Sequence, residues 1–213
     1  MANKIYYKKF KFLLMALVLM NNLGCVTATG EMIRDGVQKF YYDSGEIWAE
    51  KVYKDGKQNG ISQEYFHNGN VSKDCNYKNG KKEGIYKLYY ENGQLKEEWT
   101  FHKDRLDGMY KKYFESGKIQ EIGQMKNNAS FGSYKVFYES GQVQEEMGCI
   151  AGKNIGYYKI YYENGKLKEE GYQKNGQPIG VIKKYNDAGD LLEWGISNGE
   201  NYSYIGLENR KLR

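Results

Sequence analysis

The chain has 213 residues and a formal net charge of +5, with 22 tyrosines, three cysteines and one proline. Its excess positive charge lies at the N-terminus: residues 1–28 hold four lysines and no acidic residue, which leaves 28 of the 32 basic residues against 27 acidic ones, net +1. Since no basic tract or stripe remains in this larger part, the composition argues against nucleic-acid binding.

Residues 1–28 are typical of a secretory signal peptide. Four lysines precede an apolar run over residues 12–20, and small residues follow. The run is too short to cross a bilayer, which takes roughly 20 apolar residues in a helix. We therefore expect an exported protein, either secreted or held in a bacterial cell envelope.

Two processing sites compete at the end of this segment. The stretch LGC, which ends at Cys25, resembles a bacterial lipoprotein site and predicts lipidation and membrane anchoring through that cysteine. However, Asn22 stands where such sites have an aliphatic residue. The stretch VTA instead predicts cleavage after Ala28 and a soluble exported protein, with residues 29–35 as an N-terminal linker.

A period of 24 residues organises the rest of the chain. YYENGQLKEE at residues 89–98 returns as YYENGKLKEE at residues 161–170, three periods later. The seven related segments read YYDSGEI, YFHNGNV, YYENGQL, YFESGKI, FYESGQV, YYENGKL and YNDAGDL. Glycine recurs in two columns: Gly45, Gly69, Gly93, Gly117, Gly141, Gly165 and Gly189, and Gly36, Gly60, Gly84, Gly108, Gly132, Gly156 and Gly180. Residues 36–194 thus form seven repeats.

Each repeat predicts two strands and two tight turns. Runs rich in tyrosine and aliphatic residues alternate with short polar clusters that contain glycine, which is typical of hairpins. A three-residue loop suits sequences such as DSG, because only the glycine then needs a positive φ. We interpret both glycine columns as turn glycines. The expected fold is all-β, an elongated antiparallel meander or solenoid of seven 24-residue β-hairpin repeats.

The loop length also predicts the register within each hairpin. Counting back from the loop places Tyr90 opposite Gln94, and an aliphatic residue opposite the first aromatic of every repeat. The same count places opposite charges face to face in five hairpins. The predicted pairs are Lys87–Glu97, Lys111–Glu121, Lys135–Glu145, Lys159–Glu169 and Lys183–Glu193.

The pattern G-x-[YS]-[KQ]-x-Y-[YF]-[EDH]-[NSA]-G-x-[LIV], with Y-K-[ND]-G-K between units, resembles the bacterial variant of the MORN repeat. This resemblance implies a stack of β-hairpins. Bacterial proteins of this kind are often labelled antitoxin-like, and many are exported proteins of unknown role. Eukaryotic MORN proteins are associated with membranes, phospholipids and scaffolding. Their recurring Tyr-x-Gly-x-Trp core is missing here, so lipid binding does not transfer residue by residue.

The residues that could carry chemistry are few and scattered. Cys75 and Cys149 lie three repeats apart, on the order of 29 Å at about 4.8 Å per strand, so we expect free thiols. His67 and His102 occupy turn positions at different offsets. The glutamates recur opposite lysines, which a structural ladder explains better than acid–base catalysis. We expect no enzyme, no cofactor and no metal site.

Aromatic residues form the candidate binding surface. The first aromatic of each repeat shares a face with the aliphatic column, and the second points to the opposite face. On that opposite face we predict an aromatic stripe, which also includes Tyr42 and Phe66. Its candidate binding residues are Tyr86, Tyr110, Tyr134, Tyr158, Tyr90, Phe114, Tyr138 and Tyr162. Two interpretations stay open: the rings either stack on one another and shield the sheet, or they form an exposed binding surface.

Residues 195–213 leave the pattern and are expected to form a C-terminal cap or tail. The predicted function is that of a non-enzymatic repeat protein, which binds a protein or glycan partner or serves adhesion at the bacterial cell surface or envelope. The alternative is an antitoxin-like protein that neutralises a toxin. The sequence leaves the partner and the oligomeric state open.

Overall fold

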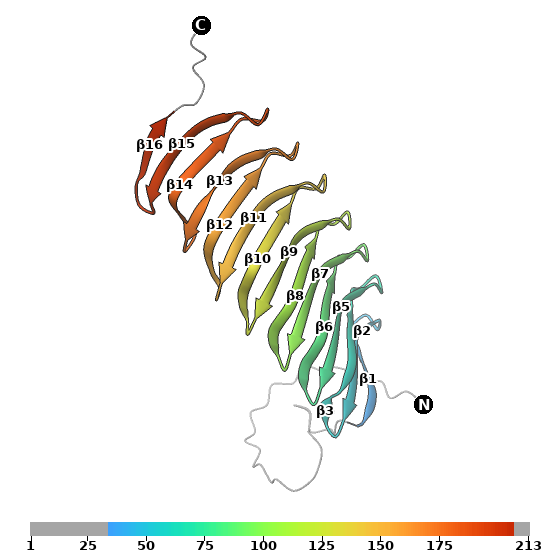
Figure 1. Cartoon of the computed structure of the whole chain (residues 1–213). Helices are drawn as coiled ribbons and strands as arrows, with labels where there is room; N and C mark the ends of the chain where they lie inside the picture. Colours follow the sequence, from blue (N-terminus) through green and yellow to red (C-terminus); the bar gives the residue numbers. More distant parts are fainter. Residues whose placement is uncertain (1–33, 207–213) are drawn as a thin grey trace. The chain divides into compact units, whose positions relative to one another are not determined.

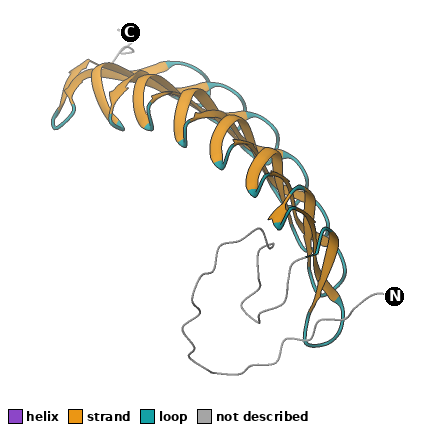
Figure 2. Ribbon diagram, turned by 90° about the horizontal axis from the view of Figure 1, so that it is seen from below, coloured by secondary structure: helices purple, strands orange, loops and turns teal. Residues whose placement is uncertain are grey.

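The computed structural model describes residues 34–206, and these contain strands and loops without any helix (Figures 1 and 2). All paired strands are antiparallel and follow one another in chain order. The predicted all-β meander of hairpins is thus confirmed. The predicted signal peptide, Cys25 and most of the N-terminal linker lie outside the described residues.

The chain divides into two compact units. The described part of the first unit comprises residues 34–95 and 101–104. Its strands are β1 (Gly36–Tyr41), β2 (Ile47–Lys54), β3 (Lys57–Gln58), β4 (Gly60–Tyr65), β5 (Val71–Lys78) and β6 (Lys81–Tyr89). Here β3 and β4 together correspond to one long strand of the later repeats.

The second unit comprises residues 96–100 and 105–206 of the described chain. Its strands are β8 (Arg105–Tyr113), β9 (Ile119–Lys126), β10 (Ala129–Phe137), β11 (Val143–Ile150), β12 (Lys153–Tyr161), β13 (Leu167–Lys174), β14 (Gln177–Tyr185), β15 (Leu191–Asn198) and β16 (Tyr202–Gly206). The strand β7 (Leu95–His102) divides its residues between the two units. Beyond Trp194 the sheet continues through the end of β15 and through β16, which pairs with β15.

The seven hairpin loops have the predicted three-residue form. In the first, the Gly45 N–H donates to the Tyr42 carbonyl at 3.0 Å, and the Tyr42 N–H donates to the Glu46 carbonyl at 2.8 Å. The loop of the third repeat is alike, with Tyr90 opposite Gln94 as expected. All seven loop glycines have φ between 82° and 102°, a region that residues with a Cβ rarely adopt.

The connections between hairpins are two-residue turns in which both residues have positive φ. Asp55 and Gly56, at 50° and 69°, show the pattern, which is that of a type I′ turn. Asn, Asp and Gly tolerate this conformation best. In the second unit, Asn128 also bonds to the preceding hairpin: its N–H donates to the Leu106 carbonyl, and its Oδ1 accepts from the Leu106 N–H.

The predicted charge pairs of the second unit are wrong by one residue. Tyr113 faces Ile119, as expected for the first aromatic, but Lys112 rather than Lys111 faces Glu121. The register also shifts in the later hairpins, where Lys135 faces Glu146, Lys159 faces Glu170, and Lys184 instead of Lys183 faces Glu193. The cause is a β-bulge beside each loop, which inserts one extra residue on the second strand of the hairpin.

The prediction that the second glycine column lies in turns is also wrong. Gly84, Gly108, Gly132, Gly156 and Gly180 lie inside strands and not in turns. Each has a positive φ, and the register shifts beside Gly84, Gly132, Gly156 and Gly180. Beside Gly84, for example, Cys75 faces Tyr86 while Tyr77 faces Lys82, so two steps along β5 match four along β6. These glycines form bulges that bend the strand.

Few side chains are fully enclosed in either unit. In the first unit, Ala49 and Cys75 are the most buried apolar residues. In the second unit they are Tyr110, Cys149, Tyr158 and Ile182. These buried positions occupy one face of the sheet, since strand residues alternate between faces. Each unit therefore has one packed face and one more open face.

Gly108, which belongs to the same glycine column, provides a test of this geometry. Its φ is 132°, and a Cβ built there would lie 2.8 Å from the Thr100 Cβ. Gly108→Ala should therefore lower the free energy of unfolding by about 2–4 kcal/mol, from backbone strain and overpacking together.

The matched control is Gly180→Ala, at the same position of a later repeat, where φ is 68° and no atom lies within 4 Å. This change should cost about 1 kcal/mol. Denaturant unfolding of both variants measures the difference, and equal losses would contradict the assigned role of the bulge.

Candidate functional site

The structure buries two central members of the predicted aromatic stripe. Tyr110 and Tyr158 are only 6% and 4% exposed. Each ring lies over a glycine of the facing strand: a Cβ on Gly123 would sit 2.7 Å from the Tyr110 ring, and one on Gly171 would sit 3.0 Å from the Tyr158 ring. For these two residues the burial favours packing over the binding interpretation.

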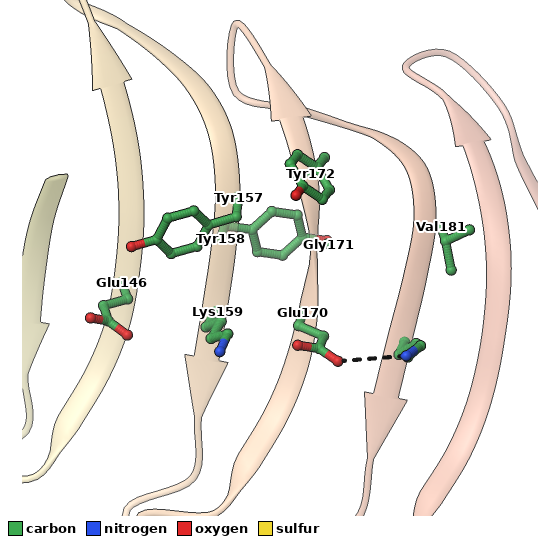
Figure 3. A pocket seen from close by; sticks show the side chains of 9 residues that line it. Glu146, Tyr157, Tyr158, Lys159, Glu170, Gly171, Tyr172 and Val181 are labelled. Carbon is green, nitrogen blue, oxygen red and sulfur yellow. Dashed lines mark ion pairs between the residues drawn. The ribbon is translucent and has the colours of Figure 1, made fainter. Parts of the chain in front are cut away.

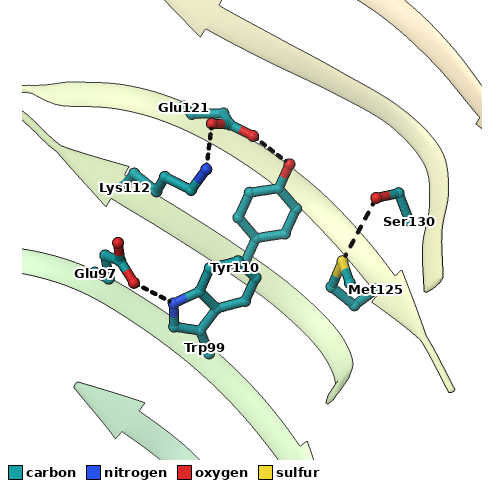
Figure 4. A network of polar contacts seen from close by, with 7 residues as sticks. All are labelled: Glu97, Trp99, Tyr110, Lys112, Glu121, Met125 and Ser130. Atoms are coloured by element: carbon teal, nitrogen blue, oxygen red, sulfur yellow. Dashed lines mark hydrogen bonds and ion pairs between the residues drawn. The ribbon is translucent and has the colours of Figure 1, made fainter. Parts of the chain in front are cut away.

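The surroundings of Tyr110 explain how a polar ring is buried (Figure 4). Its hydroxyl donates to Glu121 Oε1 at 2.6 Å, and Lys112 Nζ bonds the other carboxylate oxygen at 2.7 Å. The Trp99 ring stacks on Tyr110 with 4.8 Å between centroids, and its indole N–H donates to Glu97. A buried phenol with a charged acceptor meets the need for a hydrogen-bond partner.

Other stripe members are half-buried and packed in different ways. The Tyr134 hydroxyl lies 3.0 Å from Met147 Sδ. Tyr86 contacts Phe101 edge-on at 5.6 Å in the first unit, and Lys82 Nζ lies 4.9 Å from the centre of each of these rings. These contacts pack the rings against neighbouring side chains of the same sheet.

The stripe residues beside the loops connect successive hairpins. The Tyr138 hydroxyl donates to the Tyr161 carbonyl at 2.8 Å, and the Tyr162 hydroxyl donates to the Tyr185 carbonyl at 2.8 Å. Tyr90 and Phe114 are half-buried at the same repeat position. These aromatics therefore lie at the joints between repeats, where part of each ring remains accessible.

The opposite face carries an exposed apolar column that the sequence analysis missed. It consists of the residue that follows each glycine of the second column. Its exposed members are Val37, Ile61, Ile85, Met109, Tyr157 and Val181, while the fifth repeat has Ser133. An exposed apolar side chain thus recurs in most repeats of each unit.

Charged residues form a row beside this column in the second unit. Lys135, Glu146, Lys159, Glu170 and Lys183 face one another in turn across β10 to β14. Lys135 pairs with Glu146 at 2.7 Å, and Lys183 lies 3.9 Å from Glu170. We refer to these five residues as the charge row. Its signs alternate, so no single sign of charge dominates this part of the face.

A hollow of about 840 Å³ lies between the charge row and the apolar column (Figure 3). Its lining comprises Glu146, Tyr157, Tyr158, Lys159, Glu170, Gly171, Tyr172, Val181 and Lys183. Tyr157 and Tyr172 face each other across β12 and β13 and are 43% and 62% exposed. We call this site the tyrosine hollow.

Hydrogen bonds fix the carboxylates of the hollow. Glu146 accepts from Lys135 and from the Tyr161 hydroxyl, and the bond from Lys135 is the main cause that lowers the pKa of Glu146. Glu170 accepts from the Tyr185 hydroxyl at 2.9 Å. Burial, with this bond, raises the pKa of Tyr185 to about 12. Both carboxylates are therefore held in place by hydrogen bonds, and the lowered pKa keeps Glu146 ionised at neutral pH.

The remaining reactive groups offer little chemistry within the described residues. Cys75 and Cys149 are buried free thiols, as predicted, and burial raises the pKa of Cys75. His67 stacks on Tyr42, and His102 Nδ1 lies 3.0 Å from Glu83. Residues 34–206 contain no cluster of three or more residues suited to hold a metal ion. No helix with the length and hydrophobicity of a membrane span occurs in this part of the chain.

The repeated hairpins and their packed tyrosines define a β-hairpin repeat protein. Six segments match the model of the MORN repeat variant, at residues 34–55, 58–79, 82–103, 106–127, 132–147 and 155–175. Because these segments cover more than half of the chain, the protein belongs to the MORN repeat variant family. No curated protein matches the chain.

One solved structure that is similar to part of the chain is that of accessory secretory protein 1, 2 and 3 in Streptococcus pneumoniae. The identity is 14%, and the match covers 67% of this chain and 22% of that chain, with a TM-score of 0.19. The chain thus spans about a fifth of the length of the protein it matches. A similarity of this level carries no argument about function.

The two faces should respond differently to the loss of a tyrosine. Tyr110→Ser removes a buried ring and its bond to Glu121, and should lower the free energy of unfolding by about 3–5 kcal/mol. Tyr157→Ser, on the exposed face, should change it by no more than about 0.5 kcal/mol. Thermal melts of both variants measure this, and similar losses would contradict the assignment of a packed and an open face.

The buried phenols also predict how stability depends on pH. Burial, together with the bond to a glutamate, raises the pKa of Tyr110 and of Tyr158 above the ordinary value near 10. The unfolded chain therefore loses these protons first, so stability should hold up to about pH 10 and fall above it.

The measurement compares melting temperatures at about pH 8 and about pH 11. The Tyr110→Phe, Tyr158→Phe double variant lacks these two phenols and should lose less stability over this range. An equal drop in both proteins would show that other groups cause the alkaline loss.

Proposed function

We propose that the protein is an exported, non-enzymatic binding module that contacts a protein or glycan partner at the bacterial cell surface or envelope. The family membership supports a binding role in general terms. The observation that carries the proposal is the exposed pair Tyr157 and Tyr172 beside the charge row. Tyrosine contributes a large amphipathic contact area with little loss of side-chain freedom.

Exposed side chains of the open face can contact a partner without disturbing the packed face. In the second unit the packed face buries Tyr110, Tyr158 and Ile182, whereas Met109, Tyr157 and Val181 of the open face stay exposed. Substitutions on an open face cost little stability. Such a face can therefore change its side chains from repeat to repeat and acquire a partner.

The carboxylates of this face support recognition more than catalysis. Glu146 and Glu170 are engaged by lysine and tyrosine side chains. A general acid or base needs a pKa near the working pH, but the pKa of Glu146 is lowered, away from neutrality. Carboxylates that are held in place in this way suit hydrogen bonding to a ligand.

Export is proposed from the lysine-rich and apolar start of the chain, which precedes the described residues. Cell fractionation combined with palmitate labelling tests it, in the wild type and in Cys25→Ser. Release into the medium without label supports cleavage after Ala28, and label that Cys25→Ser removes supports the membrane-anchored form. Retention in the cytoplasm would contradict export and favour the antitoxin-like alternative.

Binding is tested with purified protein added to isolated envelope fractions. The Tyr157→Ser, Tyr172→Ser double variant should bind at least about tenfold more weakly, because exposed aromatics dominate such contacts. Met109→Ser is the matched control, at the same repeat position but outside the hollow. Equal binding by all three proteins would exclude the tyrosine hollow as the contact site.

A further inference from the structure

The tyrosine hollow is a local departure from the repeat. At the two facing positions, the fifth repeat has Ser133 and Gly148, and the fourth has Met109 and Gln124. Only the sixth of the repeats 36–194 places tyrosine at both, Tyr157 and Tyr172. Because neighbouring hairpins form with other residues at these positions, folding does not require the two rings.

The fifth repeat has small residues at the two equivalent positions. Gly148 has no side chain, and Ser133 has a short one. Val181 contributes apolar surface from the following hairpin. The two rings are part of one hollow, with Tyr157 directed toward β11 and Tyr172 on β13 (Figure 3).

Polar groups line the same hollow with balanced charge. Glu146 and Glu170 supply acceptors, and Lys159 and Lys183 supply donors. On each strand the charged residue and the tyrosine are two positions apart, such as Lys159 and Tyr157, so roughly 7 Å separates the charge row from the rings. A ligand that touches both rows must combine apolar and hydrogen-bonding surface over a short distance.

We infer that the tyrosine hollow binds a neutral oligosaccharide, an inference that rests on the proposed function. A sugar unit has an apolar C–H face for a tyrosine ring, and its hydroxyls both donate and accept hydrogen bonds. They can donate to Glu146 and Glu170 and accept from Lys159 and Lys183. The volume of about 840 Å³ lies within the range of small-ligand sites.

The charge pattern disfavours other ligands. An anionic sugar or phosphate would meet the two carboxylates, and a cationic ligand would meet the two ammonium groups. A purely apolar segment would remove all four charges from water without replacing their hydrogen bonds, which is unfavourable. A ligand with many hydroxyls and no charge satisfies all four groups.

The test presents the purified full-length protein to an array of neutral and acidic oligosaccharides and measures the affinity of the bound sugars by calorimetry. We expect binding to neutral oligosaccharides, with a loss of at least about tenfold in Tyr157→Ser and in Tyr172→Ser. Met109→Ser should bind as the wild type does. Added salt should change the affinity by less than about twofold, because the ligand is uncharged.

Two results would overturn the inference: no binding to any neutral oligosaccharide, or binding that both tyrosine variants retain. Envelope fractions treated with periodate or with protease separate this failure from failure of the proposed function. Binding that depends on Tyr172 and is lost after protease alone identifies a protein partner, which overturns the sugar ligand and keeps the binding module. Binding lost after periodate supports the inference.

Discussion

The packed face depends on one recurring interaction: a tyrosine ring lies over a glycine of the facing strand, and the tyrosine hydroxyl donates a hydrogen bond to a glutamate. Tyr110 covers Gly123 and bonds Glu121, and Tyr158 covers Gly171 and bonds Glu169 at 2.7 Å. A sheet without a second layer has little else to bury. The ring shields the exposed backbone at glycine, and the carboxylate satisfies the hydroxyl that would otherwise be buried alone.

This packing assigns the two faces different roles. On the packed face each ring lies against the facing strand, so full burial of the tyrosine needs a glycine opposite it. Tyr134 faces Met147 instead and is only half-buried. On the open face, Ser133 and Gly148 occupy positions that Tyr157 and Tyr172 fill one repeat later. Freedom to vary is what a repeat protein needs to form a specific site on a uniform scaffold.

The period, the strands and the three-residue loops could be predicted because they follow from local chemistry. Glycine is needed where φ is positive, and loops such as Asp43–Gly45 leave few alternatives. The register could not be counted past the loop, because the bulge beside Tyr113 has no residue type that marks it. The glycines before the tyrosines look like turn residues in sequence, yet Gly84 and Gly108 bend strands.

The candidate site was harder to predict than the fold. Strand alternation placed Tyr110 and Tyr158 on one face, but it could not decide whether that face was packed. The packing depends on the glycines that face these two tyrosines, and only the shifted register brings the glycines opposite them. Tyr157 and Tyr172 carry a signal that a repeat alignment exposes: both differ in kind from the residues at their positions in the neighbouring repeats. In a repeat protein, residues that keep the pattern maintain the fold, so function is best sought where one repeat departs from it at no cost to packing.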